Sequence, residues 1–299
     1  MTIRVFSFDM DGCLFNKAYR DSGRKSVIQP NQDLIRSLRK SNDNYTKSIV
    51  FLGSNRQSFY TDFHNKVKHR THSCFPVIRV IAHVLEAELD TFLLADIYGD
   101  LDDGVSFARA LNQKNQDMQH AEYKFDHTKL SIIYAQVHKI ANKYPNEDFH
   151  FDFYDDQGLR EYQDILEWLH GYFTLYPELL PTNCTLRLHH YIGDQPTQVA
   201  VITGVGLIDS NYKQTIKDMF NLVENLRDED DKSAKVNLFA KYVEPNLLKN
   251  RVLYAGVKLT NDNEPDLNNK LLEQKFFFFE DKDTSNNPSC QNNTNNFSV

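Results

Sequence analysis

Short apolar runs alternate with helical patterns along residues 5–226 of the chain. Apolar runs of about four to eight residues are typical of strands, whereas apolar residues spaced three and four apart are typical of helices. Their alternation predicts an α/β fold with a mostly parallel sheet and helices on both faces. Strands are expected at 5–8, 47–52, 91–95 and 148–154, with a hairpin at 185–192 and 198–207. Helices are expected at 31–41, 57–69, 75–89, 105–111, 129–143, 159–180 and 211–226, and the segment 16–30 is expected to be a loop.

The first apolar run ends in two carboxylates, Asp9 and Asp11, which Gly12 follows at once. Residues two apart in an extended chain point to the same side, so both carboxylates would face the crevice at the carboxyl end of a parallel sheet. Gly12 permits a sharp turn directly after them. Like charges this close are costly to bury unless a cation or a proton offsets them. The pair therefore indicates a metal site, and a metal at a strand end favours phosphate chemistry.

The stretch FDMDGCLFN resembles the first signature of the haloacid dehalogenase (HAD) superfamily of aspartyl-phosphate hydrolases. The resemblance implies a Rossmann-like core with a minimal cap, Asp9 as the nucleophile and Asp11 as the acid and base. It also implies Mg²⁺ held by Asp9 and by the backbone carbonyl of Asp11. Two alternatives stay open: D-x-D after an apolar strand holds metal and sugar nucleotide in many glycosyltransferases, or the pair is a solvated turn.

Two later segments match further motifs of the superfamily. Ser54, Asn55 and Arg56 follow the second predicted strand, and the resemblance implies that they bind the phosphoryl group at a helix start. In the plainer alternative Ser54 is a helix cap and Arg56 a surface residue. Lys129, at the start of a predicted helix, is expected to neutralise the nucleophile and the phosphoryl group, with Lys124 as second choice.

The fourth motif is an apolar strand that ends in two acids, Asp155 and Asp156. We expect Asp155 to ligate Mg²⁺ together with Asp9, because Mg²⁺ prefers few protein carboxylates, several waters and a phosphate oxygen. Asp156 is expected to ligate directly or through water. Strand alternation would place Asp152 and Asp156 on one side of the strand and Asp155 on the other. The register at the strand end therefore decides whether Asp155 or Asp156 is the direct metal ligand.

The segments at which HAD enzymes carry cap domains are short, at 16–30 and at about 96–128. An open site suits phosphates on macromolecules, and the chain is similar to HAD-type effector phosphatases that Legionella delivers into host cells by type IV secretion. That similarity implies protein phosphotyrosine as substrate, with Tyr19 and Tyr98 as rim aromatics for the substrate ring. A phosphatase of a small metabolite, a glycosyltransferase and a non-catalytic binding module remain the alternatives.

The charge balance excludes some classes of partner. With 34 Lys and Arg against 41 Asp and Glu, the net charge of −7 argues against general nucleic-acid binding. No apolar stretch approaches the roughly 18–20 residues that span a bilayer, so a soluble protein is expected. The four cysteines are widely scattered and form no zinc-ligand pattern, and Cys74 is expected to be a buried thiol without catalytic role.

Residues 1–210 are expected to form the phosphatase core and 211–283 an extension of helix and strand. Four successive phenylalanines at 276–279 predict a buried strand, or alternatively an exposed hook for a partner or a membrane surface. The polar tail 284–299 is expected to be disordered. If the phenylalanine run is an exposed hook, peripheral membrane contact through this C-terminal region is expected.

Overall fold

The computed structural model describes residues 2–112, 126, 128–156 and 165–225, and the side chains of the last helix as far as Met219. All of them belong to one compact unit of the chain, 1–257. The predictions for 211–283 beyond this helix, the phenylalanine run and the polar tail therefore lie outside the described residues. No helix among the described residues is long and apolar enough to cross a membrane.

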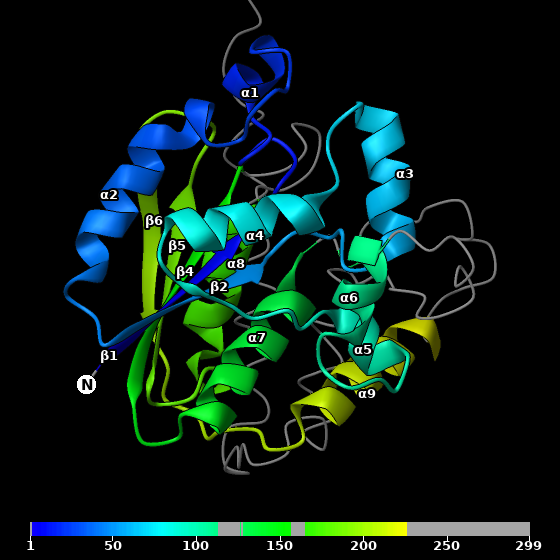
Figure 1. Ribbon diagram of the computed structural model, residues 1–299. Coiled ribbons are helices and arrows are strands. Elements are labelled where there is room, and N and C mark those ends of the chain that lie inside the picture. Colours follow the sequence, from blue (N-terminus) through cyan, green and yellow to red (C-terminus); the bar gives the residue numbers. More distant parts are fainter. Residues whose placement is uncertain (1, 113–125, 127, 157–164, 226–299) are drawn as a thin grey trace, which may run out of the picture. The chain divides into compact units, whose positions relative to one another are not determined.

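Six strands form one sheet in the order β3-β2-β1-β4-β5-β6 (Figure 1). All neighbours pair in parallel except β5 and β6, which form the antiparallel hairpin that the sequence predicts. This arrangement confirms the α/β fold with a mostly parallel sheet and is consistent with a Rossmann-like topology. The strands are β1 (Thr2–Phe8), β2 (Lys47–Leu52), β3 (Glu88–Leu89), β4 (Asp148–Asp155), β5 (Cys184–His190) and β6 (Thr197–Thr203).

Nine α-helices and two short 3₁₀ turns are assigned among the described residues. The α-helices are α1 (Lys17–Asp21), α2 (Gln32–Asn42), α3 (Phe59–His69), α4 (Cys74–Val84), α5 (Leu94–Tyr98), α6 (Val105–Asn112), α7 (Leu130–Lys143), α8 (Ile165–Leu175) and α9 (Tyr212–Asn225). The 3₁₀ turns are η1 (Gln29–Asn31) and η3 (Pro177–Leu179), and the second marks the helix break expected near Pro177.

Helices cover both faces of the sheet. Successive side chains of β1 point to opposite faces, so the contacts of this one strand show what lies on each side. Phe6 and Phe8 lie in an apolar cluster with residues of α2 and α4, among them Ile78. Ser7 faces the other way, and its hydroxyl donates to the side-chain oxygen of Gln136 in α7 at 2.7 Å. The central strands are thus buried from both sides, as their apolar sequences predict.

The third strand lies a few residues earlier than predicted. The segment 91–95 is not a strand, because the chain wraps around the buried carboxylate of Asp96 instead. That carboxylate accepts hydrogen bonds from the backbone N–H groups of Leu93, Gly104 and Ser106. Three local hydrogen bonds outweigh the strand propensity of the apolar run, and only the short β3 pairs with β2.

The segment 16–30 was expected to be a loop, but it contains α1 and is held by buried polar side chains. Asn16 caps α1 by accepting from the backbone N–H of Tyr19 at 2.9 Å. Asn31 precedes α2 without capping it; its amide donates to the carbonyls of Leu14 and Val27 at 3.0 and 2.7 Å. These side-chain bonds satisfy buried backbone groups that a solvated loop would leave to water.

Candidate functional site

Three elements bring the predicted acids and the lysine together at one edge of the sheet. Asp9 directly follows β1, and its backbone N–H donates to the carbonyl of Tyr154 at 2.9 Å. Asp155 ends β4, the parallel neighbour of β1. Lys129 precedes the first residue of α7, whose amino terminus lies at the same edge. Carboxyl ends of adjacent parallel strands meet at a sheet edge, so the order of the motifs in the sequence positions this cluster.

Lys129 forms a buried ion triad with Asp9 and Asp155. Its Nζ lies 2.8 Å from Asp9 Oδ1 and also contacts Asp155 Oδ2. Lys129 and Asp9 are each 4% exposed, and Asp155 is fully buried. Burial raises the pKa of Asp9 to about 6, with the charges of Asp155 and Asp11 adding to this effect and Lys129 opposing it. Burial lowers the pKa of Lys129, but the charges of Asp155 and Asp9 outweigh this effect and raise it.

A residue that the sequence analysis missed, Asp126, supports the position of Lys129. Lys129 has a left-handed backbone (φ 58°), which holds its side chain at the start of α7. The buried Asp126 carboxylate accepts from the backbone N–H and hydroxyl of both Thr128 and Ser131, at 2.7–2.9 Å. The signal was present in the sequence, because an acid shortly before a helix often caps its first turn. The second choice, Lys124, lies outside the described residues.

Asp9, Asp155 and Asp156 form a cluster that could hold a metal ion. One carboxylate oxygen from each lies within 4.8 Å of the others. Gly12 has φ +85°, and a Cβ at its position would stand 1.7 Å from an Asp156 oxygen, so only glycine leaves room for this carboxylate. Carboxylates are hard oxygen ligands, which suit Mg²⁺. The residues present therefore fit a divalent cation.

Strand alternation does not continue to Asp156, since β4 ends at Asp155 and both acids join the cluster. Asp152, by contrast, lies on the opposite side of the strand. Its buried carboxylate contacts Arg4 at 2.9 Å, Arg187 at 2.6 Å and His189 at 2.7 Å. These contacts engage Asp152 apart from the acid cluster, which consists of Asp9, Asp155 and Asp156.

Asp11 points away from the triad and pairs with Arg56. The Nε of Arg56 lies 2.8 Å from one oxygen of Asp11, and Nη2 contacts the other oxygen. The remaining N–H groups of the guanidinium bond Asp62 at 3.2 Å, the carbonyl of His72 at 3.1 Å and the hydroxyl of Thr71 at 2.8 Å. Arg56 is 1% exposed, and its five N–H groups are all engaged. In this conformation its guanidinium holds Asp11 and offers no donor for a phosphate.

Ser54 and Asn55 lie on the turn after β2, at the same sheet edge as Asp9, since β1 and β2 are parallel. Ser54 is buried and Asn55 half-buried. The expectation that Ser54 stands at a helix start is wrong, because α3 begins five residues later, at Phe59, with Ser58 as its cap. The side-chain amide of Gln57 stabilises this turn by donating to the carbonyls of Leu52 and Ser54 at 3.0 and 2.8 Å.

The expected rim aromatic Tyr19 is not at a rim. Its side chain is fully buried, and its hydroxyl lies 2.6 Å from Nδ1 of His72. Tyr98 is half-buried at the end of α5. Cys74 is buried, as predicted, and burial raises the pKa of its thiol well above the usual range.

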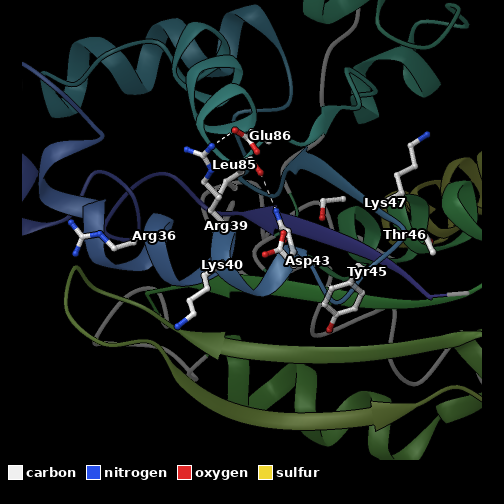
Figure 2. A pocket seen from close by; sticks show the side chains of 11 residues that line it. Arg36, Arg39, Lys40, Asp43, Tyr45, Thr46, Lys47, Leu85 and Glu86 are labelled. Atoms are coloured by element: carbon white, nitrogen blue, oxygen red, sulfur yellow. Dashed lines mark hydrogen bonds and ion pairs between the residues drawn. The ribbon is translucent and has the colours of Figure 1, made fainter.

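An open cavity of about 620 Å³ lies elsewhere on the molecule (Figure 2). It is bounded by the end of α2 and the start of β2, so it belongs to the amino-terminal end of the strands and not to the edge with the acids. Figure 2 shows Arg39 paired with Glu86. The side-chain amide of Asn42, which also lines the cavity, donates to the carbonyl of Leu85 at 3.0 Å. Its cations are already balanced in part by acids, and none of its residues was predicted to be catalytic.

The described part of the chain thus holds Asp9, Lys129, Asp155 and Asp156 together, with Asp11 and Arg56 paired beside them. The arrangement can hold a divalent cation at a cluster of carboxylates, two of which are buried. Comparisons with protein-family models, with curated proteins and with solved structures give no match to this chain.

Proposed function

We propose that the protein is a Mg²⁺-dependent phosphatase of the HAD type that acts through an aspartyl phosphate, with protein phosphotyrosine as substrate. The observation that carries the proposal is the buried cluster of Asp9, Lys129, Asp155 and Asp156 at the carboxyl ends of β1 and β4. Three of the four sequence segments that carry the resemblance meet in this cluster, which chance matches have no reason to do.

Asp9 is the nucleophile in this proposal. One of its oxygens attacks phosphorus and the bond from phosphorus to the leaving oxygen breaks, so the phosphoryl group passes to the carboxylate. Lys129 fixes the orientation of Asp9 through the 2.8 Å contact and offsets charge that develops on the phosphoryl oxygens. Asp155 holds the other side of the ammonium, so Lys129 cannot swing away from Asp9 without also losing its contact with a second buried carboxylate.

Asp11 supplies the proton that the leaving oxygen needs, and then accepts one from the water that hydrolyses the aspartyl phosphate. The products are inorganic phosphate, the dephosphorylated alcohol and regenerated Asp9. Because both oxygens of Asp11 accept hydrogen bonds from Arg56, one of these bonds opens before Asp11 reaches the leaving group. A side chain that is 35% exposed has room for this movement.

Asp9, Asp155, Asp156 and the backbone carbonyl of Asp11 would hold Mg²⁺, which would shield the negative phosphoryl oxygens from the attacking carboxylate. Ser54 and Asn55 are the remaining candidates for donors to the phosphoryl group, since their turn lies at the same edge of the sheet. Delivery into a host cell is implied by the sequence resemblance alone and stays a prediction.

The choice of phosphotyrosine rests on the short segments at the two cap positions and on the buried nucleophile. Asp9 is only 4% exposed, and a phosphotyrosine ring carries its phosphate farther from the peptide backbone than phosphoserine does. A long, flat side chain therefore reaches a recessed carboxylate that a short one does not. Values of kcat/KM for phosphotyrosine peptides, phosphoserine peptides and sugar phosphates decide between a protein phosphatase and a metabolite phosphatase.

The test of the general proposal is hydrolysis of para-nitrophenyl phosphate with and without Mg²⁺. We expect activity that EDTA removes and Mg²⁺ restores, and that Asp9→Asn abolishes. Asp11→Asn should lower turnover by about 10²–10⁴-fold, the usual effect of a positioned acid and base. Asp33→Asn, an exposed carboxylate of α2, is the matched control and should keep full activity. Wild-type turnover by Asp9→Asn would rule out the aspartyl phosphate.

A further inference from the structure

The solvent-facing side of α3 is apolar. Tyr60, Phe63 and Val67 follow one another at intervals of three and four residues, which places them on one face of the helix. They are 54%, 43% and 61% exposed. Phe59 stacks on Phe63 at 6.0 Å between ring centroids and extends this apolar stripe at its start. A helix of a globular protein normally directs such a stripe to the core.

The inward side of the same helix is polar, so the usual pattern is reversed. Asp62 is buried, and its carboxylate accepts from Arg56 at 3.2 Å and from the backbone N–H of Cys74 at 3.0 Å. Ser58 and Thr61 cap the helix through a reciprocal pair of hydrogen bonds. Polar contacts, a cap and the partly buried Phe59, which packs against the apolar core, attach α3 to the molecule, whereas Tyr60, Phe63 and Val67 stay exposed.

Cations flank the apolar stripe. Lys68 is exposed beside it, and Lys66 and Arg70 lie near its other border. The single acid of α3 is the buried Asp62. The whole chain has a net charge of −7, so an exposed basic surface on one helix does not follow from the composition. Its charge is complementary to an anionic partner.

The stripe differs from other exposed apolar residues in the described part of the chain. Val80 of α4 is a single exposed side chain, which is ordinary for a soluble protein. Val199 and Val201 on the edge strand β6 are 37% and 51% exposed, but they are aliphatic and stand on a strand whose other exposed residues are neutral. Only α3 joins exposed aromatic rings to flanking cations.

We propose that α3 is a peripheral membrane-docking helix whose apolar stripe enters the surface of an anionic phospholipid bilayer. A helix of this kind lies in the plane of the interface, with aromatic side chains below the headgroups and cations among the lipid phosphates. The stripe is convex, so a protein partner would need a matching groove, whereas a bilayer adapts to the helix. The proposal is independent of the proposed catalytic function.

Docking through α3 has a consequence for the candidate site. Arg56 bonds Asp62 of α3 with one edge and Asp11 with the other, so the helix is tied to the loop that carries the predicted acid and base. In Figure 1, α3 forms part of the connection that leads from β2 to α4. A bilayer that holds α3 therefore holds the edge of the sheet near its surface.

The experiment measures co-sedimentation of the full chain with vesicles of phosphatidylcholine and phosphatidylserine in a 7:3 ratio. We expect the triple variant Tyr60→Ser, Phe63→Ser, Val67→Ser to lower the vesicle partition coefficient about tenfold or more, since three apolar side chains leave the interface. Lys68→Glu should weaken binding to these vesicles, and added salt should reduce this difference. The matched control, Val199→Ser with Val201→Ser, removes exposed apolar side chains from β6 and should bind as the wild type does.

A second measurement places the helix at the lipid directly. In Phe63→Trp, acyl chains brominated near the headgroup should quench the new fluorescence, whereas the wild type, which has one tryptophan, gives the background. The proposal is overturned if the triple variant and the wild type partition equally, or if Trp at 63 is not quenched. It is also overturned if the triple variant loses binding to polyglutamate while the wild type does not bind the vesicles. That outcome would assign the surface to an acidic protein partner.

Discussion

Lys129 is the residue on which the charge balance of the site depends. Its ammonium separates the carboxylates of Asp9 and Asp155, all three of them buried. We predict that Lys129→Met lowers the free energy of unfolding by about 3–5 kcal/mol, because removal of one partner leaves buried like charges uncompensated. Mg²⁺ should restore part of this loss if the carboxylates bind it. Urea unfolding with and without Mg²⁺ measures both effects.

The control for this prediction is Lys17→Met. Lys17 pairs with Asp21 in α1, and its side chain is 82% exposed, so its loss should change stability by no more than about 0.5 kcal/mol. Equal stability of Lys129→Met and Lys17→Met would mean that the triad does not exist as described.

Arg56 distinguishes two roles that the sequence could not separate. The motif predicts a phosphate-binding guanidinium, whereas the structure gives its N–H groups to Asp11, Asp62 and neighbouring oxygens. If Arg56 positions Asp11, Arg56→Lys lowers kcat on the order of tenfold or more and leaves KM nearly unchanged. If it binds the phosphoryl group, KM rises instead. Steady-state kinetics with one aryl phosphate separates the two, and Arg36→Lys on the exposed face of α2 is the control.

At the scale of single residues, the sequence predicted the acids and the lysine because each stands at a strand end or helix start with a strong local pattern. It could not predict Asp62 as the partner of Arg56, or Asp11 as its main ligand. Those contacts form because the turn after β2 lies against the loop after β1, and the spacing of the residues in the sequence does not predict that contact.

Among the elements, α7 is joined to the segment before α9 by a buried histidine. The Nε2 of His138 lies 3.0 Å from the carbonyl of Leu179, and Nδ1 accepts from the backbone N–H of Asp209 at 3.1 Å. An N–H can only donate, so Nδ1 is unprotonated and the imidazole is neutral. Burial lowers the pKa of His138 to about 4, although the Leu179 carbonyl and the charge of Asp209 act in the opposite direction. The ring of Tyr134 packs against it at 4.2 Å.

This histidine predicts a pH dependence of stability with a defined sign. An ordinary histidine has a pKa of 6.5, so below that pH the unfolded chain binds a proton that the folded chain takes up only near pH 4. The contribution of neutral His138 to the free energy of unfolding is complete above about pH 6.5. It falls by roughly 3 kcal/mol as the pH drops to about 4. Urea unfolding across this range should show the loss, and His138→Gln should remove it. An unchanged pH profile in His138→Gln would assign the dependence to other groups.

Element boundaries were predictable where one local signal dominated. The strands β2 and β4 and the helices α7 and α9 agree with the sequence pattern to within about one or two residues. The prediction was wrong at 91–95 because one buried carboxylate, Asp96, organises the backbone around it. Hydrogen bonds from one side chain to three backbone groups depend on the folded structure, so the strand propensity of the neighbouring residues does not predict them.

For the molecule as a whole, the order of the strands could not be read from periodicity. The alternation of strand and helix predicts a parallel sheet, but the central place of β1, between β2 and β4, follows only from the packed fold. That place makes the site possible, because the acids after β1 and β4 and the turn after β2 share one edge. The sequence thus predicted the acids and the lysine of the proposed site, and the sheet order explains why they lie together.

Binding of Mg²⁺ to the folded state predicts a gain in stability of the whole chain that needs no activity to measure. At a concentration of about one hundred times Kd, a ligand that binds only the folded state adds about 2.7 kcal/mol, which raises Tm by several degrees. We expect this rise for the wild type in Mg²⁺ and little of it in Asp156→Asn, which removes one carboxylate of the cluster. The same ionic strength in NaCl is the control for general screening. Equal shifts of Tm in Mg²⁺ and NaCl would show that the three carboxylates do not form a magnesium site, whatever the result of the phosphatase assay.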